Sequence, residues 1–352
     1  MRDNNKMRPF AKKTILWQQQ HGRHDLPWQN TRDPYPIWVS EIMLQQTQVS
    51  AVVGYFTRFM ARFPDIAALS RASIDEVMPY WAGLGYYARA RNLYKAALII
   101  RDRFAGVFPS HFEDVLALPG IGRSTAAAIC VFAHDHARPI LDGNVKRVFA
   151  RYFGVTGDIR SKAVENQMWA IAEREAPTSR VAAYIQGQMD LGATICVRRA
   201  PDCPLCPLRR DCVAHQTNRV NDLPARITKK PRPHRELQML VLLSAEAVLL
   251  EKRPSAGIWG GLWSLPEAPR NDNVRALAKT RFGITLARGR KPQALSPIEH
   301  GFTHYTLTIH PVVLRVGGID AVSGTTGTLW LNLDDVSGAA LPAPVKKILL
   351  QL

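Results

Sequence analysis

The chain has 352 residues, of which 46% are hydrophobic, and this length favours two globular domains. Lysine and arginine outnumber aspartate and glutamate by 46 to 29, and the net charge of +17 favours a polyanionic partner, with nucleic acid first, over a purely solubilising role. No apolar run approaches the roughly 18 residues of a membrane span, and the polar start at residues 1–6 lacks the apolar core of a signal peptide, so we expect a cytoplasmic, nucleoid-associated protein without membrane contact.

The first part of the chain, residues 1–218, is expected to form an all-α domain. Strand-like alternation is absent there, and apolar side chains recur with the helical period in three stretches, 40–63, 85–104 and 144–153. Prolines that punctuate this pattern indicate short connections between helices: Pro64, Pro109 and Pro119.

The first candidate for chemistry is Glu41, in a helix expected to begin one residue earlier. The apolar residues 42–44 follow it, so its carboxyl should border an apolar pocket, where loss of water raises the pKa and makes the group a proton donor to a leaving base. A solvated glutamate in a first helical turn is the alternative, because the helix dipole favours one there. Neutral amides support the chemical interpretation, since they can replace the pairing partners of an extruded base, and three follow closely: Gln45, Gln46 and Gln48.

Residues 83–91, Gly-Leu-Gly-Tyr-Tyr-Ala-Arg-Ala-Arg, join aromatic side chains to arginines at the start of a helix. Leu84 or an aromatic such as Tyr86 could enter a base stack while the arginines meet phosphates. Packing in the core explains such tyrosines equally well.

Two glycines in the segment 119–122, Pro-Gly-Ile-Gly, stand between two helical runs. Because they lack a Cβ, Gly120 and Gly122 permit a tight turn and let backbone N–H groups approach a phosphate at the start of the next helix. Together with the positive charge, this favours a helix-hairpin-helix DNA element over an ordinary corner between helices. Such an element contacts the DNA backbone, so base discrimination must come from other residues.

The second candidate carboxylate is Asp142, in the segment 141–147, Leu-Asp-Gly-Asn-Val-Lys-Arg. A structural explanation exists, because Asp142 and the next glycine can form a turn while Asn144 caps the following helix. The chemical interpretation is that cleavage of a glycosidic bond builds positive charge on the sugar, which a second, ionised carboxylate stabilises. Lys146 and Arg147 nearby would keep Asp142 charged.

Four cysteines within the segment 196–212 predict a metal centre: Cys196, Cys203, Cys206 and Cys212. Four thiolates suit either tetrahedral zinc or a 4Fe-4S cluster. Structural zinc usually takes two C-x2-C pairs, whereas this segment has one such pair flanked by single cysteines, which favours the cluster. Unrelated core or disulfide cysteines are disfavoured by the prolines between them. The fifth cysteine, Cys130, lies in an apolar run and is expected to be buried.

Residues 219–235 are rich in proline and cations and are predicted to be a basic, extended linker. A second domain of α/β or α+β class follows at 236–352. Strands are expected at 239–243, 247–250, around 305–309 and at 329–333. Helices are expected at 273–282, closed by Gly283, and at the C-terminus through Val345, Ile348, Leu349 and Leu352.

Four segments together resemble the adenine DNA glycosylase family of the helix-hairpin-helix, endonuclease III-like superfamily: 38–49, 118–125, 141–146 and the four cysteines. The resemblance spans roughly residues 10 to 350, with the motifs in the family's order. It implies an enzyme that removes adenine mispaired with 8-oxoguanine, or with guanine, from double-stranded DNA, that carries a 4Fe-4S cluster and that acts as a monomer.

The resemblance also assigns roles to residues. Glu41 would protonate adenine, at N7, and help to activate water, Asp142 would stabilise the sugar cation, and Asn144 would orient the catalytic groups. Residues expected in the adenine pocket are Trp28, Leu44 and Gln186, and those expected beside 8-oxoguanine are Gln46, Leu84 and Tyr86. Contacts to the DNA backbone are expected from Gly120, Gly122, Ser124 and Lys146.

Related enzymes that also cut the DNA strand carry a lysine nucleophile where this chain has Ser124, so the resemblance implies a monofunctional glycosylase. The second domain resembles the family's Nudix-like module, in which Thr303 and His304 would contact 8-oxoguanine, although the family commonly has serine at the threonine position. Its helix at 273–280 lacks the carboxylates of Nudix hydrolases, which disfavours pyrophosphate hydrolysis. The alternatives are therefore an endonuclease III-type lyase acting on oxidised pyrimidines, a Nudix hydrolase and a non-catalytic iron-sulfur DNA-binding protein.

Overall fold

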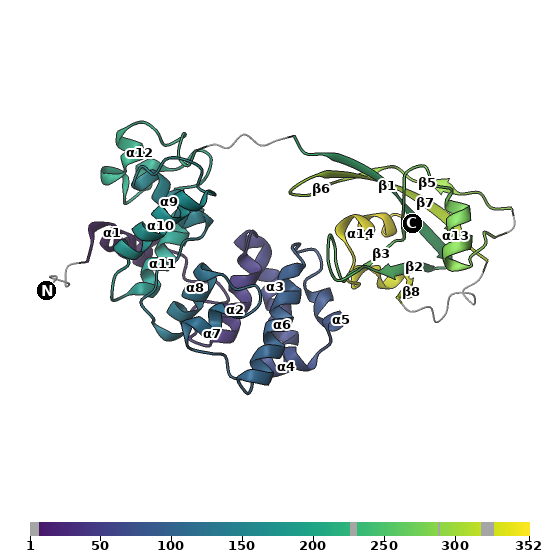
Figure 1. Cartoon of the computed structure of the whole chain (residues 1–352), viewed down its shortest axis with the longest axis horizontal. Coiled ribbons are helices and arrows are strands. Elements are labelled where there is room, and N and C mark those ends of the chain that lie inside the picture. Colours follow the sequence, from purple (N-terminus) through teal and green to yellow (C-terminus); the bar gives the residue numbers. More distant parts are fainter. Residues whose placement is uncertain (1–6, 226–230, 288, 318–326) are drawn as a thin grey trace. The chain divides into compact units, whose positions relative to one another are not determined.

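The computed structural model describes residues 7–225, 231–287, 289–317 and 327–352 (Figure 1). These residues form two compact units, one from 7–71 with 92–225 and the other from 72–91 with the described part of 231–352. The polar start at 1–6 and residues 226–230 of the expected linker lie outside the described residues. Within the described ranges, no helix combines the length and apolar character required to cross a membrane.

The first unit is all-α, as predicted. Its helices are α1 (Pro9–His21), α2 (Pro34–Leu44), α3 (Val49–Arg62), α4 (Ile66–Arg71), α6 (Ala88–Arg103, from residue 92 onward), α7 (Phe112–Leu116), α8 (Arg123–His134), α9 (Gly143–Tyr152), α10 (Lys162–Glu175), α11 (Val181–Asp190) and α12 (Val213–Gln216). A π-helical turn and two 3-10 turns complete it: η2 (Leu191–Ile195), η3 (Cys203–Leu205) and η4 (Arg209–Asp211).

The apolar pattern over 40–63 belongs to two helices, not to one helix beginning near Ser40. The first of them, α2, begins at Pro34, where the Asp33 side chain accepts a hydrogen bond from the Tyr35 N–H at 2.9 Å. It ends at Leu44 because Gln46 adopts a left-handed conformation with φ of 59°, which an α-helix cannot contain. Helical periodicity continues across the break, so the pattern alone does not reveal it.

Aromatic packing holds together the helices that carry the site. The Phe10 ring lies 5.6 Å from that of Phe149, 4.8 Å from Tyr152 and 6.1 Å from Tyr184, joining α1 to α9 and α11. All four rings are buried. Burying one such side chain contributes about 1.5–3 kcal/mol, so this cluster fixes α9 and α11 firmly against each other.

The second unit is built on a mixed β-sheet, shown in green to yellow in Figure 1, which confirms the predicted α/β class. Its strands are β1 (His234–Ser244), β2 (Ala247–Lys252), β3 (Trp263–Ser264), β4 (Glu267–Ala268), β5 (Gln293–Ala294), β6 (Ile298–Gly301), β7 (Thr306–Arg315) and β8 (Thr328–Asn332). The other elements are α5 (Ile74–Val77), η1 (Met78–Tyr80), α13 (Val274–Phe282), η5 (Leu333–Ser337) and α14 (Ala343–Leu349).

The strands follow the order β3-β2-β1-β7-β5, with β1 and β7 parallel and in register from His234 opposite Thr306 to Leu243 opposite Arg315. The later part of β1 is buried on both faces: Leu240 and Leu242 pack with α13, and the alternate residues 239, 241 and 243 are also enclosed. This two-sided burial explains the continuous apolar run at residues 239–243, whereas the exposed start of the strand, residues 234–236, is polar.

Both predicted helices of this unit form. Asn273 caps α13, and Gly283 ends it with φ of 67°, as expected. The C-terminal helix α14 ends at Leu349, so Leu352, predicted on its buried face, is 44% exposed.

The expected linker is shorter than 219–235. Leu223 is buried, and the carbonyl oxygens of Val220 and Leu223 accept hydrogen bonds from Arg151 at 3.1 and 2.9 Å. Strand β1 already begins at His234. The start of the proline-rich segment therefore packs on the helical unit, because a buried guanidinium holds its backbone carbonyls.

Candidate active site

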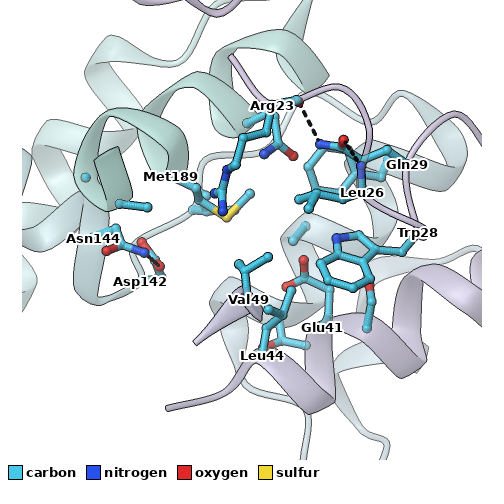
Figure 2. Close-up of a pocket in the computed structure, with 18 of the residues that line it drawn as sticks. Arg23, Leu26, Trp28, Gln29, Glu41, Leu44, Val49, Asp142, Asn144 and Met189 are labelled. Carbon is cyan, nitrogen blue, oxygen red and sulfur yellow. Dashed lines mark hydrogen bonds between the residues drawn. The ribbon is translucent and has the colours of Figure 1, made fainter. Parts of the chain in front are cut away.

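A cleft of about 1530 Å³ opens in the helical unit (Figure 2). Its walls come from the segment after α1, from α2 and the turn that follows it, from the start of α8, from the start of α9, and from α11 with η2. The sequence-predicted residues that line it are Trp28, Glu41, Leu44, Gln46, Gly120, Gly122, Ser124, Asp142, Asn144 and Gln186. Lys146 is not among the lining residues.

Glu41 lies in the last turn and a half of α2 and is not the first-turn glutamate of the alternative interpretation. A carboxylate there gains nothing from the helix dipole, whose negative end is near. Trp28 and Leu44 also line this wall of the cleft (Figure 2). Burial, and then the negative charge of Asp142, raises the pKa of Glu41 to about 8. At neutral pH Glu41 is therefore mainly a neutral acid.

Asp142 is the N-cap of α9, a role that the sequence had suggested for Asn144. One carboxyl oxygen of Asp142 accepts the Val145 N–H at 2.8 Å, and the other accepts the Asn144 side-chain N–H at 3.1 Å. The Asp142 carboxylate accepts from the N–H groups of the first helical turn directly. Asn144 lies inside that turn, and its side-chain amide donates to the Asp142 carboxylate. Both oxygens of Asp142 are thus fixed in position.

Opposing effects act on the charge of Asp142. Burial raises its pKa, while the N–H groups of Val145 and Asn144 and the positive charge of Arg147 act in the lowering direction. Lys146, which was expected to keep Asp142 charged, instead pairs with Glu165 at 2.8 Å. With Lys146 engaged by Glu165, Arg147 is the cation that acts on Asp142.

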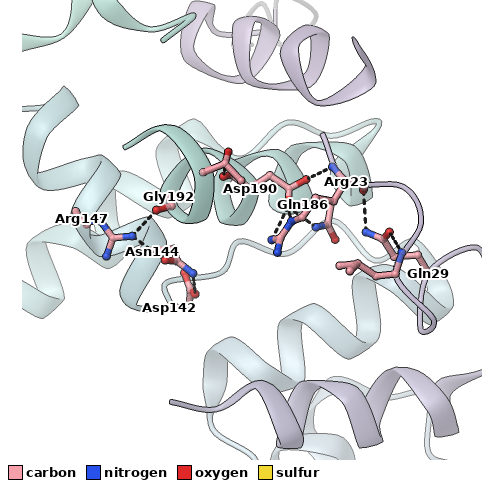
Figure 3. A network of polar contacts seen from close by, with 10 residues as sticks. Arg23, Gln29, Asp142, Asn144, Arg147, Gln186, Asp190 and Gly192 are labelled. Carbon is pink, nitrogen blue, oxygen red and sulfur yellow. Dashed lines mark hydrogen bonds and ion pairs between the residues drawn. The ribbon is translucent and has the colours of Figure 1, made fainter. Parts of the chain in front are cut away.

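Arg147 links the cap to the cysteine segment, and its bonds to Asn144 and Gly192 are drawn in Figure 3. Its Nη2 donates to Asn144 Oδ1 at 2.8 Å and to the Gly192 carbonyl at 2.5 Å, and its Nε donates to the Cys196 carbonyl at 2.8 Å. A Cβ on Gly192 would lie 2.5 Å from the Asn144 Cβ, so only glycine allows η2 this close to α9.

Sequence reasoning missed Arg23, which lines another wall of the cleft, and Asp190, which lies behind that wall. Arg23 and Asp190 form an ion pair with a shortest distance of 2.7 Å, and Gln186 donates to Asp190 at 2.9 Å (Figure 3). One signal in the sequence could have pointed to Asp190: it is the lone acidic residue of its helix and follows Gln186 by four positions, so the two side chains lie on the same face. Its partner is far away in the sequence, so the signal gave no hint of the pair.

The predicted hairpin forms between α7 and α8. Gly120 has φ of 81°, and a Cβ there would lie 2.8 Å from the Asn92 Cβ. Gly122 precedes α8 and is exposed, as is Arg123. The Ser124 hydroxyl accepts the Leu141 N–H at 3.0 Å, which ties the hairpin to the segment that leads into Asp142.

The four clustered cysteines line one small cavity of about 30 Å³, together with Arg151. Arg151 is 3% exposed, and its Nη1 donates to Cys196 Sγ at 3.3 Å. Burial raises the pKa of Cys206 to about 12, and the other three cysteines act in the same direction. Among the described residues, no three His, Cys, Asp or Glu side chains are grouped as around a single metal ion. Cys130 is buried elsewhere, as expected.

The remaining predicted residues belong to the second unit. Leu84 is 7% exposed, whereas Tyr86 is 46% exposed and has φ of 50°. Thr303 and His304 are exposed in the turn between β6 and β7. Under this turn, the Phe302 ring packs 5.2 Å from Trp259 and 4.7 Å from Tyr305, so the turn has a rigid aromatic base.

Comparisons with known proteins agree with this architecture. Residues 39–174 match the HhH-GPD superfamily of base excision DNA repair proteins, and residues 238–351 match the NUDIX domain. The chain is 36% identical to an adenine DNA glycosylase of Buchnera aphidicola subsp. Acyrthosiphon pisum, over 97% of this chain and 96% of that protein. It is 31% identical to the adenine DNA glycosylase of Mus musculus, over 96% and 77% of the respective chains.

Among solved structures, a thermostable thymine-DNA glycosylase aligns with a TM-score of 0.53 and 27% identity, over 59% of this chain and 95% of that one. The helical unit thus has the fold of known glycosylases. High coverage of relatives more than 30% identical, combined with both domain matches, shows that the chain belongs to the adenine DNA glycosylase family.

Proposed function

We propose that this protein hydrolyses the N-glycosidic bond of adenine mispaired with 8-oxoguanine, or with guanine, in double-stranded DNA. The observation that carries the proposal is the pair of carboxyl groups in the cleft, with the Glu41 pKa raised to about 8 and Asp142 fixed by N–H donors. One acid and one ionised carboxylate are what glycosidic cleavage requires. The relatives named adenine DNA glycosylases support the choice of base.

In the proposed reaction, the Glu41 carboxyl gives its proton to adenine at N7, and the electron pair of the C–N bond moves to the base. Positive charge then develops on the sugar, where the Asp142 carboxylate stabilises it. Water adds to the sugar carbon, and the Glu41 carboxylate takes up the proton that the water loses. The products are free adenine and a sugar without a base, and the enzyme returns to its starting state.

Ser124 supports a monofunctional enzyme over the endonuclease III-type alternative. A hydroxyl cannot form the imine through which a lysine nucleophile cuts the strand, and Ser124 Oγ is already bonded to the Leu141 N–H. A non-catalytic DNA-binding role is disfavoured because a buried acid of raised pKa costs stability and is typical of catalytic sites.

The cysteine segment fits the proposed 4Fe-4S cluster. Four sulfur atoms line a common cavity, and the backbone N–H groups of Leu208 and His215 favour the thiolate forms of Cys206 and Cys212. Arg151 adds a donor to Cys196. When bound, the cluster would hold the segment 196–212 in one conformation. The exposed Arg209 and Arg210 of that segment could then contact DNA phosphates.

Recognition of 8-oxoguanine is proposed for the second unit, through Thr303 and His304 in their exposed turn. Nudix hydrolysis is disfavoured, because α13 contains no aspartate or glutamate. Arg281 of this helix instead forms an ion pair with Glu251 at 2.8 Å. A monomeric state and a nucleoid-associated, cytoplasmic location stay predictions.

The acid role predicts that Glu41→Gln still binds an A·8-oxoguanine duplex but releases adenine at least about 10²-fold more slowly, because an amide keeps the shape and cannot donate an acidic proton. Asp142→Asn should be similarly impaired, although asparagine also caps a helix well. Single-turnover release of adenine measures both. Near-normal release by Glu41→Gln would remove Glu41 from this role.

The raised pKa of Glu41 predicts the pH dependence of single-turnover adenine release. The rate should fall as pH rises through about 8, because the protonated acid is lost. It should also fall at acidic pH, where Asp142 takes up a proton, at a pH above the ordinary range for aspartate because burial raises that pKa. A rate that stays constant from pH 7 to well above 9 would contradict the assignment.

The cluster predicts a brown protein that absorbs near 400 nm and contains about four irons per chain. Iron and zinc analysis of anaerobically prepared protein measures this directly. Replacing Cys203 by serine should lower the iron content and the thermal stability, whereas Cys130→Ser should leave the iron content unchanged. Stoichiometric zinc without iron would show that the segment is a zinc site instead.

The recognition turn predicts that Thr303→Ala combined with His304→Ala weakens binding to an 8-oxoguanine duplex about 10- to 100-fold, the loss expected for one or two hydrogen bonds. Binding to an A·G duplex should change little. Equilibrium titrations at one fixed salt concentration, in the Glu41→Gln background, separate the two duplexes. Thr285→Ala, an exposed change in the same unit, is the control. Equal losses on both duplexes would place recognition elsewhere.

A further inference from the structure

Asp190, the last residue of α11, is a carboxylate with no exposed surface. It lies behind the cleft wall and is not one of the lining residues. Its oxygens accept the Arg23 backbone N–H at 3.0 Å, the Arg23 Nε–H at 2.8 Å and the Gln186 side-chain N–H at 2.9 Å (Figure 3). A second guanidinium nitrogen of Arg23 lies 2.7 Å away. The carboxylate is thus buried with a full set of donors.

The chain is shaped to make this contact. A Cβ on Gly22 would lie 2.5 Å from the Gln18 carbonyl oxygen and 3.1 Å from Asp190 Oδ2, so a larger residue would push the Arg23 N–H away from the carboxylate. The Gln29 side chain then donates to the Arg23 carbonyl at 3.0 Å and holds the segment in place. These contacts fix Asp190 and Arg23 before any ligand enters the cleft.

The fixed carboxylate determines which way the Gln186 amide faces. An ionised carboxylate can only accept hydrogen bonds, so Gln186 must turn its NH2 group toward Asp190. The Gln186 carbonyl oxygen is then turned away from Asp190. Gln186 lines the cleft, and no partner for this oxygen is found among the described residues. The cleft wall therefore presents a hydrogen-bond acceptor at Gln186.

An acceptor at this position distinguishes the two classes of purine. Adenine carries a 6-amino group, which donates, whereas hypoxanthine and guanine carry a 6-oxo group, which only accepts. A 6-oxo group facing the Gln186 oxygen would place two acceptors against each other without a proton between them. Were the amide reversed, the preference would reverse too. Specificity of this kind thus depends on what prevents the amide from turning.

We propose that Asp190 is a positioning residue that, held by Arg23, fixes the Gln186 amide with its oxygen toward the base and so makes the cleft select 6-aminopurines over 6-oxopurines. This inference rests on the proposed function, because it assumes that the purine to be released occupies this cleft.

The test compares single-turnover release of adenine and hypoxanthine, each opposite 8-oxoguanine, by the full-length protein. Asp190→Leu removes the acceptor at similar volume, and Arg23, whose side chain is 25% exposed, can still reach water. The ratio of the adenine rate to the hypoxanthine rate should fall about 10- to 100-fold. Glu175→Met is the matched control: Glu175 is also a buried, ion-paired carboxylate of the helical unit, but it is remote from the cleft lining. Its ratio should not change.

Gln186→Leu separates positioning from a general structural role. It should lower the same ratio by itself, and adding Asp190→Leu should then change the ratio no further, because the group being positioned is gone. An equal fall of both rates in Asp190→Leu, or a further fall of the ratio in the double variant, would overturn the proposal.

If Asp190→Leu does not fold, as judged by cooperative thermal unfolding, wild type and Gln186→Leu still decide the matter. Equal ratios in these two proteins overturn the proposal, and a fall of at least about tenfold in Gln186→Leu supports it. A wild-type protein that releases no purine from any duplex would instead show that the proposed function is wrong, and the inference would fall with it.

Discussion

Two carboxyl groups line one cleft, and the negative charge of Asp142 disfavours ionisation of Glu41. Burial raises the pKa of both groups, so any difference between their pKa values comes from the side chains and N–H groups next to each carboxyl. Asp142 has N–H donors on both oxygens and Arg147 nearby, whereas Asp142 itself is the charged group that acts on Glu41. The N–H donors and Arg147 favour the ionised form of Asp142, whereas no such donor in the described part of the chain favours the ionised form of Glu41, so the same functional group has different chemical capacities at the two positions.

Packing between the helices offsets the free-energy cost of burying these two carboxyl groups. Two partly buried carboxyl groups destabilise the folded chain, and the aromatic cluster around Phe10 and Phe149 offsets that cost while holding α1, α9 and α11 together. Two glycines also allow backbone segments to pack closer to neighbouring side chains than any other residue would permit. Gly192 brings η2 against Asn144, and Gly22 brings the Arg23 backbone against Asp190. At these points shape, more than hydrogen bonding, limits which residue the chain can use.

Motifs predicted from the sequence were those whose residues lie near one another along the chain. The hairpin at Gly120, the cap segment at Asp142 and the strands β1, β2, β7 and β8 could be predicted because local patterns specify them, whereas the short strands β3 to β6 were not predicted. The pair of Arg23 and Asp190 could not, because its partners are separated by 167 residues and neither belongs to a motif. The choice between Asp142 and Asn144 as cap also needed the structure, since both residue types cap helices well. Periodicity likewise missed the break after Leu44, where one left-handed residue ends a helix without changing the apolar pattern.

Arg151 joins the cysteine segment to the start of the proline-rich segment. The same guanidinium donates to the carbonyls of Val220 and Leu223 on one side and to Cys196 Sγ and the Val197 carbonyl on the other. Disorder in the cysteine segment would remove half of these contacts and release residues that now lie against α9. The order of the cysteine segment thus bears on whether residues 220–223 stay packed on the helical unit.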